Sequence, residues 1–382
     1  CPHHAKYAEK YSFDELQKYK YRIALPAPTL YGQFNNLDDT DYVLTALKKL
    51  GFDDVFEVSA AAELVSEATR AYLAELSHSG RKKPVISSAC PAVVRLIRVR
   101  FPNLIENVLD FNPPMEEAAR LARERAVKRT GYSKSDIGIF FITPCTAKIT
   151  AIKQPICNNG SNVDGVFGIK DIYPSLLHEM ENTDKTELLR DSGIIGVSWA
   201  SSGGEASALL TDRYLAADGI ENVIKVLEEI EDEKLSDLDF IELNACPGGC
   251  VGGPLTVENP YVAKARIQHL RKYMPVSCNH LEIKTVPRYM RWDNPLKELP
   301  VMRLSDDMGE ALQKMGEMKK IESSLPGLDC GTCGAPSCSD LAEDIVRGKA
   351  SIEDCVFFSR ENTDKNNYIP IPAPFRKTEK NE

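Results

Sequence analysis

Three short motifs hold the cysteines best placed to do chemistry in this chain of 382 residues. They contain Cys90, Cys145 and the pair Cys246 and Cys250, and each follows an apolar run bounded by Gly or Pro. Such runs are typical of buried strands, and ligands of parallel sheets collect at the carboxyl ends of the strands. Four thiolates could therefore meet at one point, which is the ligand set of a cubane iron–sulfur cluster.

The spacing within the third motif suits a bulky inorganic group. Two glycines lie between Cys246-Pro247 and Cys250, and glycine lets a backbone pass close to a cluster. Cys90 and Cys246 are both expected just before a helix, where free N–H groups favour an anionic cluster. The alternative is a set of unrelated buried cysteines, since free cysteine is often part of a core.

The three motifs resemble the active-site signatures of [FeFe]-hydrogenases, and the likeness extends over most of residues 21–260. It is carried by the segments SSACP, TPCTAK and NACPGGCVGG. The resemblance implies two α/β lobes enclosing an H-cluster, in which Cys250 bridges a [4Fe-4S] cluster to a diiron subsite with CO, cyanide and azadithiolate. It also implies the cluster ligands Cys90, Cys145, Cys246 and Cys250.

Further residues take roles from the same resemblance. Lys148 matches the lysine that binds a cyanide ligand, through a charge-assisted hydrogen bond worth about 1.5–3 kcal/mol. Thr143 and Asn244 replace two methionines that line the subsite, and both can hydrogen-bond an iron ligand or a sulfur. The positions expected to contact the cofactor are Pro26, Ala27, Ser88 and Lys148.

The departures from the family pattern concern the proton path. Catalytic members carry a cysteine just before the first ligand cysteine, whereas this chain has Ala89, which has no exchangeable proton. Glu67 matches the first glutamate of the relay, but Leu109 and Arg70 stand where a serine and a second glutamate would be. Because general acid–base help is typically worth about 10²–10⁴-fold, fast turnover by the usual route is not expected. The pattern resembles the sensory type of [FeFe]-hydrogenase.

A second cysteine group follows near the carboxyl end, with the spacing C-x2-C-x4-C-x16-C. A short helix over 339–348, ended by glycine, is expected within it. Spacing alone allows zinc or iron. The group resembles the small [4Fe-4S] modules of corrinoid iron–sulfur proteins, which favours an additional [4Fe-4S] cluster over structural zinc. Its ligands would be Cys330, Cys333, Cys338 and Cys355.

Composition narrows the function classes. The net charge of −9 argues against nucleic acid or an anionic membrane as the main partner, and we find no transmembrane run and no signal peptide. Eleven cysteines with metal-type spacing predict a reducing, cytoplasmic setting. The opening Cys1-Pro2 has the form in which a ferredoxin motif ends, so residues 1–20 are interpreted as the remnant of a ferredoxin-like segment.

Alternating strand and helix patterns predict an α/β fold with mostly parallel sheets. We expect an H-cluster domain over 21–285, with lobes over about 21–162 and 163–285, and a small C-terminal [4Fe-4S] domain over 286–382. Strands are expected at 22–28, 55–58, 84–88, 137–142, 165–169, 213–217 and 240–243. Helices are expected at 38–50, 60–76, 116–130, 173–180, 220–230 and 306–321.

The predicted function is reversible heterolytic H₂ cleavage by an oxidoreductase, slow and used to sense H₂ or redox state. Its partners would be H₂, an electron-transfer partner such as ferredoxin or a signalling protein, and diiron maturation proteins. One alternative is a high-turnover hydrogenase with a different proton path. Another is an iron–sulfur assembly or scaffold protein that keeps the four cysteines without the diiron subsite.

Overall fold

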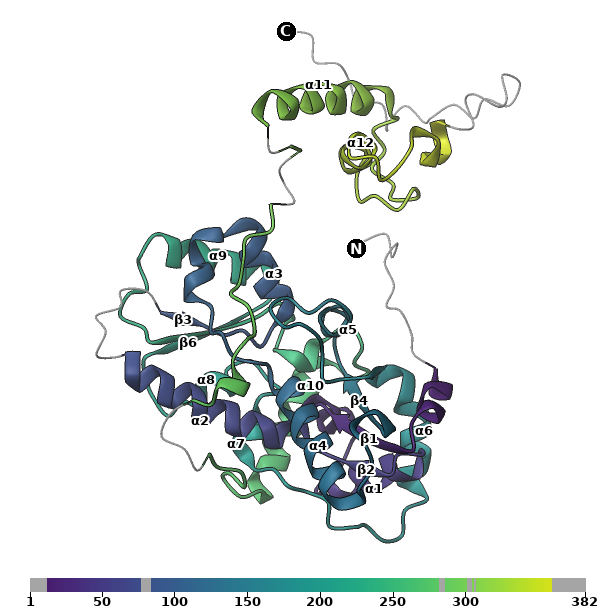
Figure 1. Cartoon of the computed structure of the whole chain (residues 1–382), viewed down its shortest axis with the longest axis vertical. Helices are drawn as coiled ribbons and strands as arrows, with labels where there is room; N and C mark the ends of the chain where they lie inside the picture. Colours follow the sequence, from purple (N-terminus) through teal and green to yellow (C-terminus); the bar gives the residue numbers. More distant parts are fainter. Residues whose placement is uncertain (1–11, 77–83, 282–285, 301–303, 306, 359–382) are drawn as a thin grey trace. The chain divides into compact units, whose positions relative to one another are not determined.

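The computed structural model describes residues 12–76, 84–281, 286–300, 304–305 and 307–358. Its chain divides into two compact units, Lys10–Leu299 and a smaller one that begins at Pro300 (Figure 1). The boundary therefore lies later than the predicted start at 286. The reason is packing: Met290 is 2% exposed within a core of the larger unit, and Trp292 donates its backbone N–H to the Asp110 carbonyl.

The larger unit contains two sheets in which every strand pair is parallel, which confirms the predicted α/β class. One sheet has the order β2-β1-β4-β5 and the other β3-β7-β6. The central strand β4 is buried along its whole length, as its unbroken apolar run predicts. The strands are β1 (Tyr21–Pro26), β2 (Asp54–Val55), β3 (Val85–Ile86), β4 (Ile137–Thr143), β5 (Gly165–Gly168), β6 (Tyr214–Asp218) and β7 (Phe240–Asn244).

The two sheets are not built from consecutive halves of the chain, which corrects the predicted lobes 21–162 and 163–285. Strand β3 pairs with β7, whereas β5 pairs with β4. The chain thus enters the second sheet early, returns to the first, and then completes the second. The apolar runs have similar compositions, so the sequence of one strand does not indicate which sheet it joins. Its sheet is decided by pairing with strands that are distant in the sequence.

Helices cover both sheets and bury their apolar stripes against them. Two helices have clear end signals: α3 begins with Pro91 at its first position, and α4 ends at Gly131, whose φ of 73° is left-handed. The helices of the larger unit are α1 (Asp41–Lys49), α2 (Val58–Leu76), α3 (Pro91–Arg100), α4 (Pro114–Thr130), α5 (Thr146–Lys153), α6 (Ile169–Glu181), α7 (Ile194–Ser198), α8 (Gly204–Ser207), α9 (Ile220–Glu231) and α10 (Pro260–Leu270).

The amino-terminal residues that the structure describes belong to the larger unit. Residues 1–11 of the proposed ferredoxin-like remnant lie outside the described residues. The 3₁₀ helix Phe13–Lys18 packs on the first sheet, because Leu16 is buried there and the ring of Phe13 stacks on Phe167. Leu16 thus anchors this otherwise largely exposed segment to the core of the larger unit.

The smaller unit is built on two helices with their own small core. Helix α11 (Met308–Ser324) packs on α12 (Cys338–Val346), and Leu325, Leu341 and Ala342 are buried between them and the loops. The predicted short helix over 339–348 is thus present, and Gly348 follows it with a φ of 69°. In the part of the chain that the structure describes, we find no helix with the length and apolar character needed to cross a membrane.

Candidate functional site

The four cysteines of the first group lie at strand ends, as the sequence predicts. Cys90 follows β3 and caps α3, and Cys145 follows β4 and caps α5. Cys246 lies in the turn after β7 and Cys250 starts the 3₁₀ helix Cys250–Gly252. Cys246 does not precede a helix, contrary to expectation; the second helix N-terminus belongs to Cys145, because β7 leads into a glycine turn.

A half-buried lysine, Lys148, lies beside the side chains of this group. The Lys148 ammonium donates to Cys250 Sγ over 3.5 Å. Burial alone would lower the pKa of Lys148, but the nearby Cys250, Cys145 and Cys90 thiolates raise it above its usual value. Burial, and then the other three thiolates, raise the pKa of Cys246 to about 12. The four cysteines, which follow strands of two different sheets, therefore lie close enough to shift one another's pKa values.

The arrangement fits a cluster better than a single ion. Among the described residues, no three His, Cys, Asp or Glu side chains are close enough together to hold one metal ion. A cubane is larger than an ion and takes its thiolates at separate corners. The four cysteines shift one another's pKa values but are too far apart to bind one ion. This spacing is compatible with the size of a cubane.

Glycines in the third motif allow the close approach of backbone segments. A Cβ on Gly249 would lie 2.3 Å from the backbone nitrogen of Ser202, and one on Gly253 would lie 2.3 Å from the carbonyl oxygen of Pro144. Since Pro144 precedes Cys145, the second contact holds Cys250 and Cys145 in register. Glycine is required here by space as well as by the φ of 91° at Gly249.

Substituting Gly253→Ala should therefore damage the site. The added methyl group has to push the third motif away from Pro144, at a cost of about 1–3 kcal/mol in stability, and the cysteines should lose part of their capacity to retain iron. Thermal unfolding and iron content after reconstitution measure both effects. Gly160→Ala is the matched control, because a Cβ there meets nothing within 4 Å; equal behaviour of the two variants would contradict the argument.

A cavity lies next to Cys250 and Lys148. The space between its lining atoms amounts to about 600 Å³, a volume that includes open solvent. Its wall includes Ala89 and Ala27, which the sequence singled out, together with Asn244. The lysine and the small side chain at position 89 thus face one chamber, as the family resemblance implies.

The other predicted contact residues support this region through hydrogen bonds. The Thr143 hydroxyl accepts from the Cys145 N–H at 3.2 Å, so it orients a ligand loop. The Ser88 hydroxyl donates to the Phe111 carbonyl at 3.1 Å, and Asn244 Nδ2 donates to Glu242 at 2.7 Å. Pro26 ends β1 beside Ile142.

Glu67, the predicted first glutamate of the relay, is held by hydrogen bonds outside the cavity. It does not occur among the described residues that line the cavity. Its carboxylate accepts from His280 Nδ1 at 2.7 Å and from the Leu281 N–H at 2.6 Å, and it pairs with Arg70 at 3.5 Å. Leu109 is 2% exposed in an apolar core. Leu109 therefore offers no hydroxyl at the position matched to the serine, and a part for Glu67 in proton transfer stays a prediction.

Two buried carboxyl groups that the sequence analysis did not single out line the same cavity. Glu205 is on α8 and Glu242 is in the middle of β7. The Ser87 hydroxyl donates to Glu205 at 2.6 Å and accepts from the Ala89 N–H at 3.1 Å. Glu242 could have been noticed in the sequence, because it is a charged residue within the apolar run of β7. Glu205 had none, because its burial depends on the long-range packing of α8.

The environment raises the pKa of both carboxyl groups, but their hydrogen-bond partners differ. Burial, reinforced by Glu242, raises the pKa of Glu205 to about 8. Burial also raises the pKa of Glu242, but its carboxylate accepts from the Gly203 N–H, the Ala206 N–H and Asn244, which favour the charged form. Glu205 is therefore the member that holds a proton near neutral pH.

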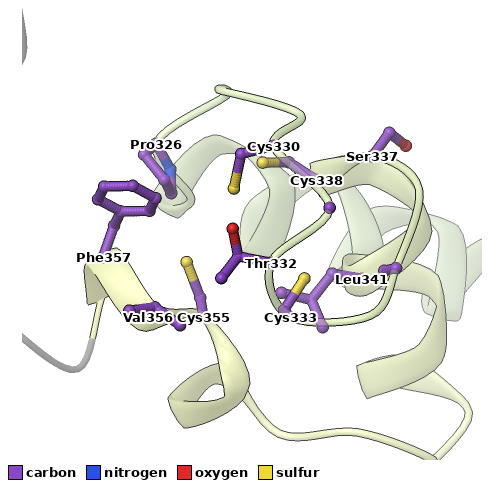
Figure 2. A pocket seen from close by; sticks show the side chains of 12 residues that line it. Pro326, Cys330, Thr332, Cys333, Ser337, Cys338, Leu341, Cys355, Val356 and Phe357 are labelled. Atoms are coloured by element: carbon purple, nitrogen blue, oxygen red, sulfur yellow. The ribbon is translucent and has the colours of Figure 1, made fainter. Parts of the chain in front are cut away.

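The second cysteine group surrounds a small pocket in the smaller unit (Figure 2). Three of its cysteines come from the loop before α12 and its first residue, and Cys355 comes from the segment after it. The Cys338 N–H donates to Asp329 at 2.8 Å, which fixes the loop at the start of α12. The side chains that face the pocket include Cys330, Cys333, Cys338 and Cys355.

Comparison with known families agrees with the two units. Residues 20–214 and 179–254, together more than half of the chain, match the family described as iron only hydrogenase large subunit, C-terminal domain. The chain belongs to this family. Residues 325–357, which contain the second cysteine group, match a family described as "Putative Fe-S cluster".

Individual relatives are distant. Iron hydrogenase 1 of Clostridium pasteurianum is 20% identical over 284 residues, which are 61% of this chain and 50% of the relative. The probable cytosolic Fe-S cluster assembly factor oxy-4 of Caenorhabditis elegans is 21% identical over 260 residues, 55% of this chain and 56% of the relative. The chain thus spans about half the length of these curated relatives.

Solved structures support the fold. A variant of the [FeFe]-hydrogenase of Chlamydomonas reinhardtii aligns with a TM-score of 0.53 at 17% identity, covering 69% of this chain and 85% of that one. At this identity the match establishes a shared fold. The predicted membership and the predicted α/β class are both confirmed.

Proposed function

We propose that this chain splits H₂ reversibly into two protons and two electrons, and that this slow reaction serves to sense H₂ or redox state. The observation that supports it best is the cavity bordered by both Cys250 and Lys148. Four thiolates are enough to hold a cubane. The cavity next to Cys250 therefore offers space for a further group attached to that cysteine. Three features of the chain would suit that group: the thiol of Cys250, the half-buried ammonium of Lys148 and the small side chains of Ala27 and Ala89 in the wall.

The ligands of the cubane would be Cys90, Cys145, Cys246 and Cys250. When bound, the diiron group of this family would supply a metal centre that polarises H₂ and an amine that takes up a proton. Lys148 would donate to a cyanide nitrogen, with its ammonium already held in place by Cys250. Ala89 can offer no proton, and Glu205, which lines the cavity and has a raised pKa, would exchange one with it.

The partners of this reaction follow from its chemistry. The two electrons would leave to an electron-transfer partner, a ferredoxin or a signalling protein. Diiron maturation proteins would have to deliver the group, and a reducing, cytoplasmic compartment would keep the thiols free. In the smaller unit, Cys330, Cys333, Cys338 and Cys355 would hold an additional [4Fe-4S] cluster; a structural zinc is the alternative, and metal analysis after reconstitution distinguishes them.

Iron–sulfur assembly is the second candidate function, favoured by the similarity to an assembly factor. The contact between Lys148 and Cys250 gives the lysine a role that needs no cyanide, because it offsets thiolate charge. Lys148 alone therefore does not decide between the two functions. The cavity favours the hydrogenase function, because a scaffold protein that binds no diiron group needs no space beside Cys250.

Infrared spectroscopy tests the proposal. The protein would be reconstituted with iron and sulfide without oxygen, and then loaded with a synthetic diiron azadithiolate complex carrying CO and cyanide. We expect protein-bound CO and cyanide bands that shift when argon is replaced by H₂, with low turnover in the same sample. High turnover would establish the fast catalytic alternative. Absence of bound bands with a filled cubane would overturn the proposal and favour assembly.

A further inference from the structure

A second cavity, bordered by Ala89 and Glu116, shares part of its wall with the cavity next to Cys250. The space between its lining atoms amounts to about 510 Å³, a volume that includes open solvent. Three residues line both cavities: Ala89, Pro113 and Met115. Because Ala89 has the smallest side chain of the three, position 89 offers the least obstruction between the two cavities.

Two ionisable side chains line the second cavity within the part of the chain that the structure describes, Glu116 and Cys157. Burial raises the pKa of Cys157 to about 11, so its thiol releases no proton near neutral pH. Burial also raises the pKa of Glu116, which brings the carboxyl group closer to the pH at which proton exchange is efficient. Ser88 and Asn158 line the cavity as well, and their polar groups can bond water there.

Glu116 connects the second cavity with the protein surface. Its carboxylate accepts from the Ser161 hydroxyl at 2.6 Å and from the Asn162 N–H at 2.7 Å. The Ser161 hydroxyl itself accepts from the Val163 N–H at 3.1 Å, so its proton is directed at Glu116. Glu116 is 5% exposed, whereas Ser161 is half-buried and Asn162 is exposed. The carboxyl group therefore lies between a solvent-facing loop and the cavity.

We infer that Glu116 carries protons between solvent and the second cavity, from which water passes them beyond Ala89 to the cavity next to Cys250. The inference rests on the proposed function, which takes up or releases protons at that site. Glu205 is buried, so each proton that it gives up has to be replaced from solvent. Glu116 thus acts through Glu205 and the water between them, and it is a positioning residue for the proton.

Glu116→Gln tests the inference in the loaded protein, because glutamine keeps the shape and carries no acidic proton. We expect H₂ evolution to fall by about 10²-fold. The ratio of turnover in light water to turnover in deuterated water should rise, because proton delivery becomes the slow step. Turnover and isotope ratio equal to those of the original protein, with its cyanide bands present, would overturn the inference and leave the proposed function intact.

Glu117→Gln is the matched control. Glu117 is 1% exposed, burial raises its pKa as well, and it pairs with Arg120 at 3.0 Å, but among the described residues it lines neither cavity. Its variant should keep the turnover and the isotope ratio of the original protein. Equal losses in both variants would make the effect of Glu116 a structural one and would overturn the inference.

The carboxyl group itself gives a readout that needs no diiron complex. At mildly acidic pH, the infrared difference between the original protein and Glu116→Gln should contain the C=O band of a protonated carboxyl group. This band should shift in deuterated water, because Ser161 links the group to solvent. A difference spectrum with carboxylate bands alone, or a C=O band that deuterated water does not shift, would overturn the inference.

The position of the crossing is tested in Ala89→Cys. A thiol at position 89 would draw protons from the second cavity, so Glu116→Gln should lower turnover in this background too, whereas Glu205→Gln should matter less. No effect of Glu116→Gln there would show that protons do not pass position 89 and would overturn the inference. Absence of cyanide bands in the original protein would instead overturn the proposed function, and the inference with it.

Discussion

Turnover of H₂ is expected to rise by about 10²–10⁴-fold when Ala89 is replaced by cysteine in the protein loaded with the diiron complex. The side chain at position 89 lines the cavity that Lys148 and Cys250 border, so a thiol there would face the bound group. A thiol near its usual pKa can give and take protons, which a methyl group cannot. Evolution of H₂ with a reduced viologen dye and exchange between H₂ and deuterated water both measure the gain.

Ala89→Ser is the control for size and polarity. Serine adds one atom, as cysteine does, but its hydroxyl is a far weaker acid, so we expect less than a tenth of the gain. Infrared bands should be present in all three proteins, which separates turnover from loading. If cysteine and serine gave the same turnover as alanine, proton supply at position 89 would not limit the reaction, and the explanation of slow turnover would be wrong.

Much of the site could be predicted because its signals are local. An apolar run that stops at Gly or Pro marks a strand end, and Cys90 and Cys145 lie within four residues of such ends. Pro91 after Cys90 marks a helix start in the same way. Parallel strands then bring their carboxyl ends together, so the meeting of the cysteines follows from the pattern.

The rest depends on contacts between distant segments. Strand β3 is only two residues long, and its pairing of Val85 with Phe240 decides which sheet holds Cys90. No local feature of residues 84–88 indicates that partner. The predicted contiguous lobes failed for this reason, although the strands themselves were located.

The proton-carrying groups show the same limit. Family matching directed attention to Glu67, whose carboxylate in fact binds His280 and the backbone of Leu281. Glu205 lies in a four-residue helix, and its burial follows from its neighbours in three dimensions. The pKa of a carboxyl group is shifted by desolvation and by nearby charges. Neither can be predicted from the residues next to it in the sequence.

Glu205→Gln is expected to lower the remaining H₂ turnover by about 10²-fold and to remove a titration near pH 8. Since burial and Glu242 raise the pKa of Glu205 to about 8, the carboxyl is mostly protonated at neutral pH and can donate into the cavity. H₂ evolution by the loaded original protein should fall as pH rises through this value. Glutamine cannot titrate, so the variant should be slow throughout. Turnover measured from pH 6 to pH 10 checks both effects.

The same substitution should change how stability depends on pH. The folded-state pKa of Glu205 is raised from a reference value of 4.5 to about 8, so between these values the native state keeps a proton that the unfolded chain releases. Its contribution to stability is therefore fully present below the lower value and is lost as pH rises through about 8, by at most about 1.4 kcal/mol per pH unit. Denaturant unfolding at several pH values should show a smaller decline in Glu205→Gln.

Glu57→Gln is the control for Glu205→Gln, because it removes a buried carboxyl group that is not expected to supply protons to the cavity. Glu57 is 2% exposed and burial raises its pKa too, but it accepts from the Tyr31 hydroxyl at 2.6 Å and does not line the cavity among the described residues. Its variant should change stability and leave the pH profile of turnover as it was. In Ala89→Cys, Glu205→Gln should matter less, because the new thiol supplies the proton. If turnover of Glu205→Gln still fell as pH rose through about 8, the titrating group, and the source of the proton, would be a different residue.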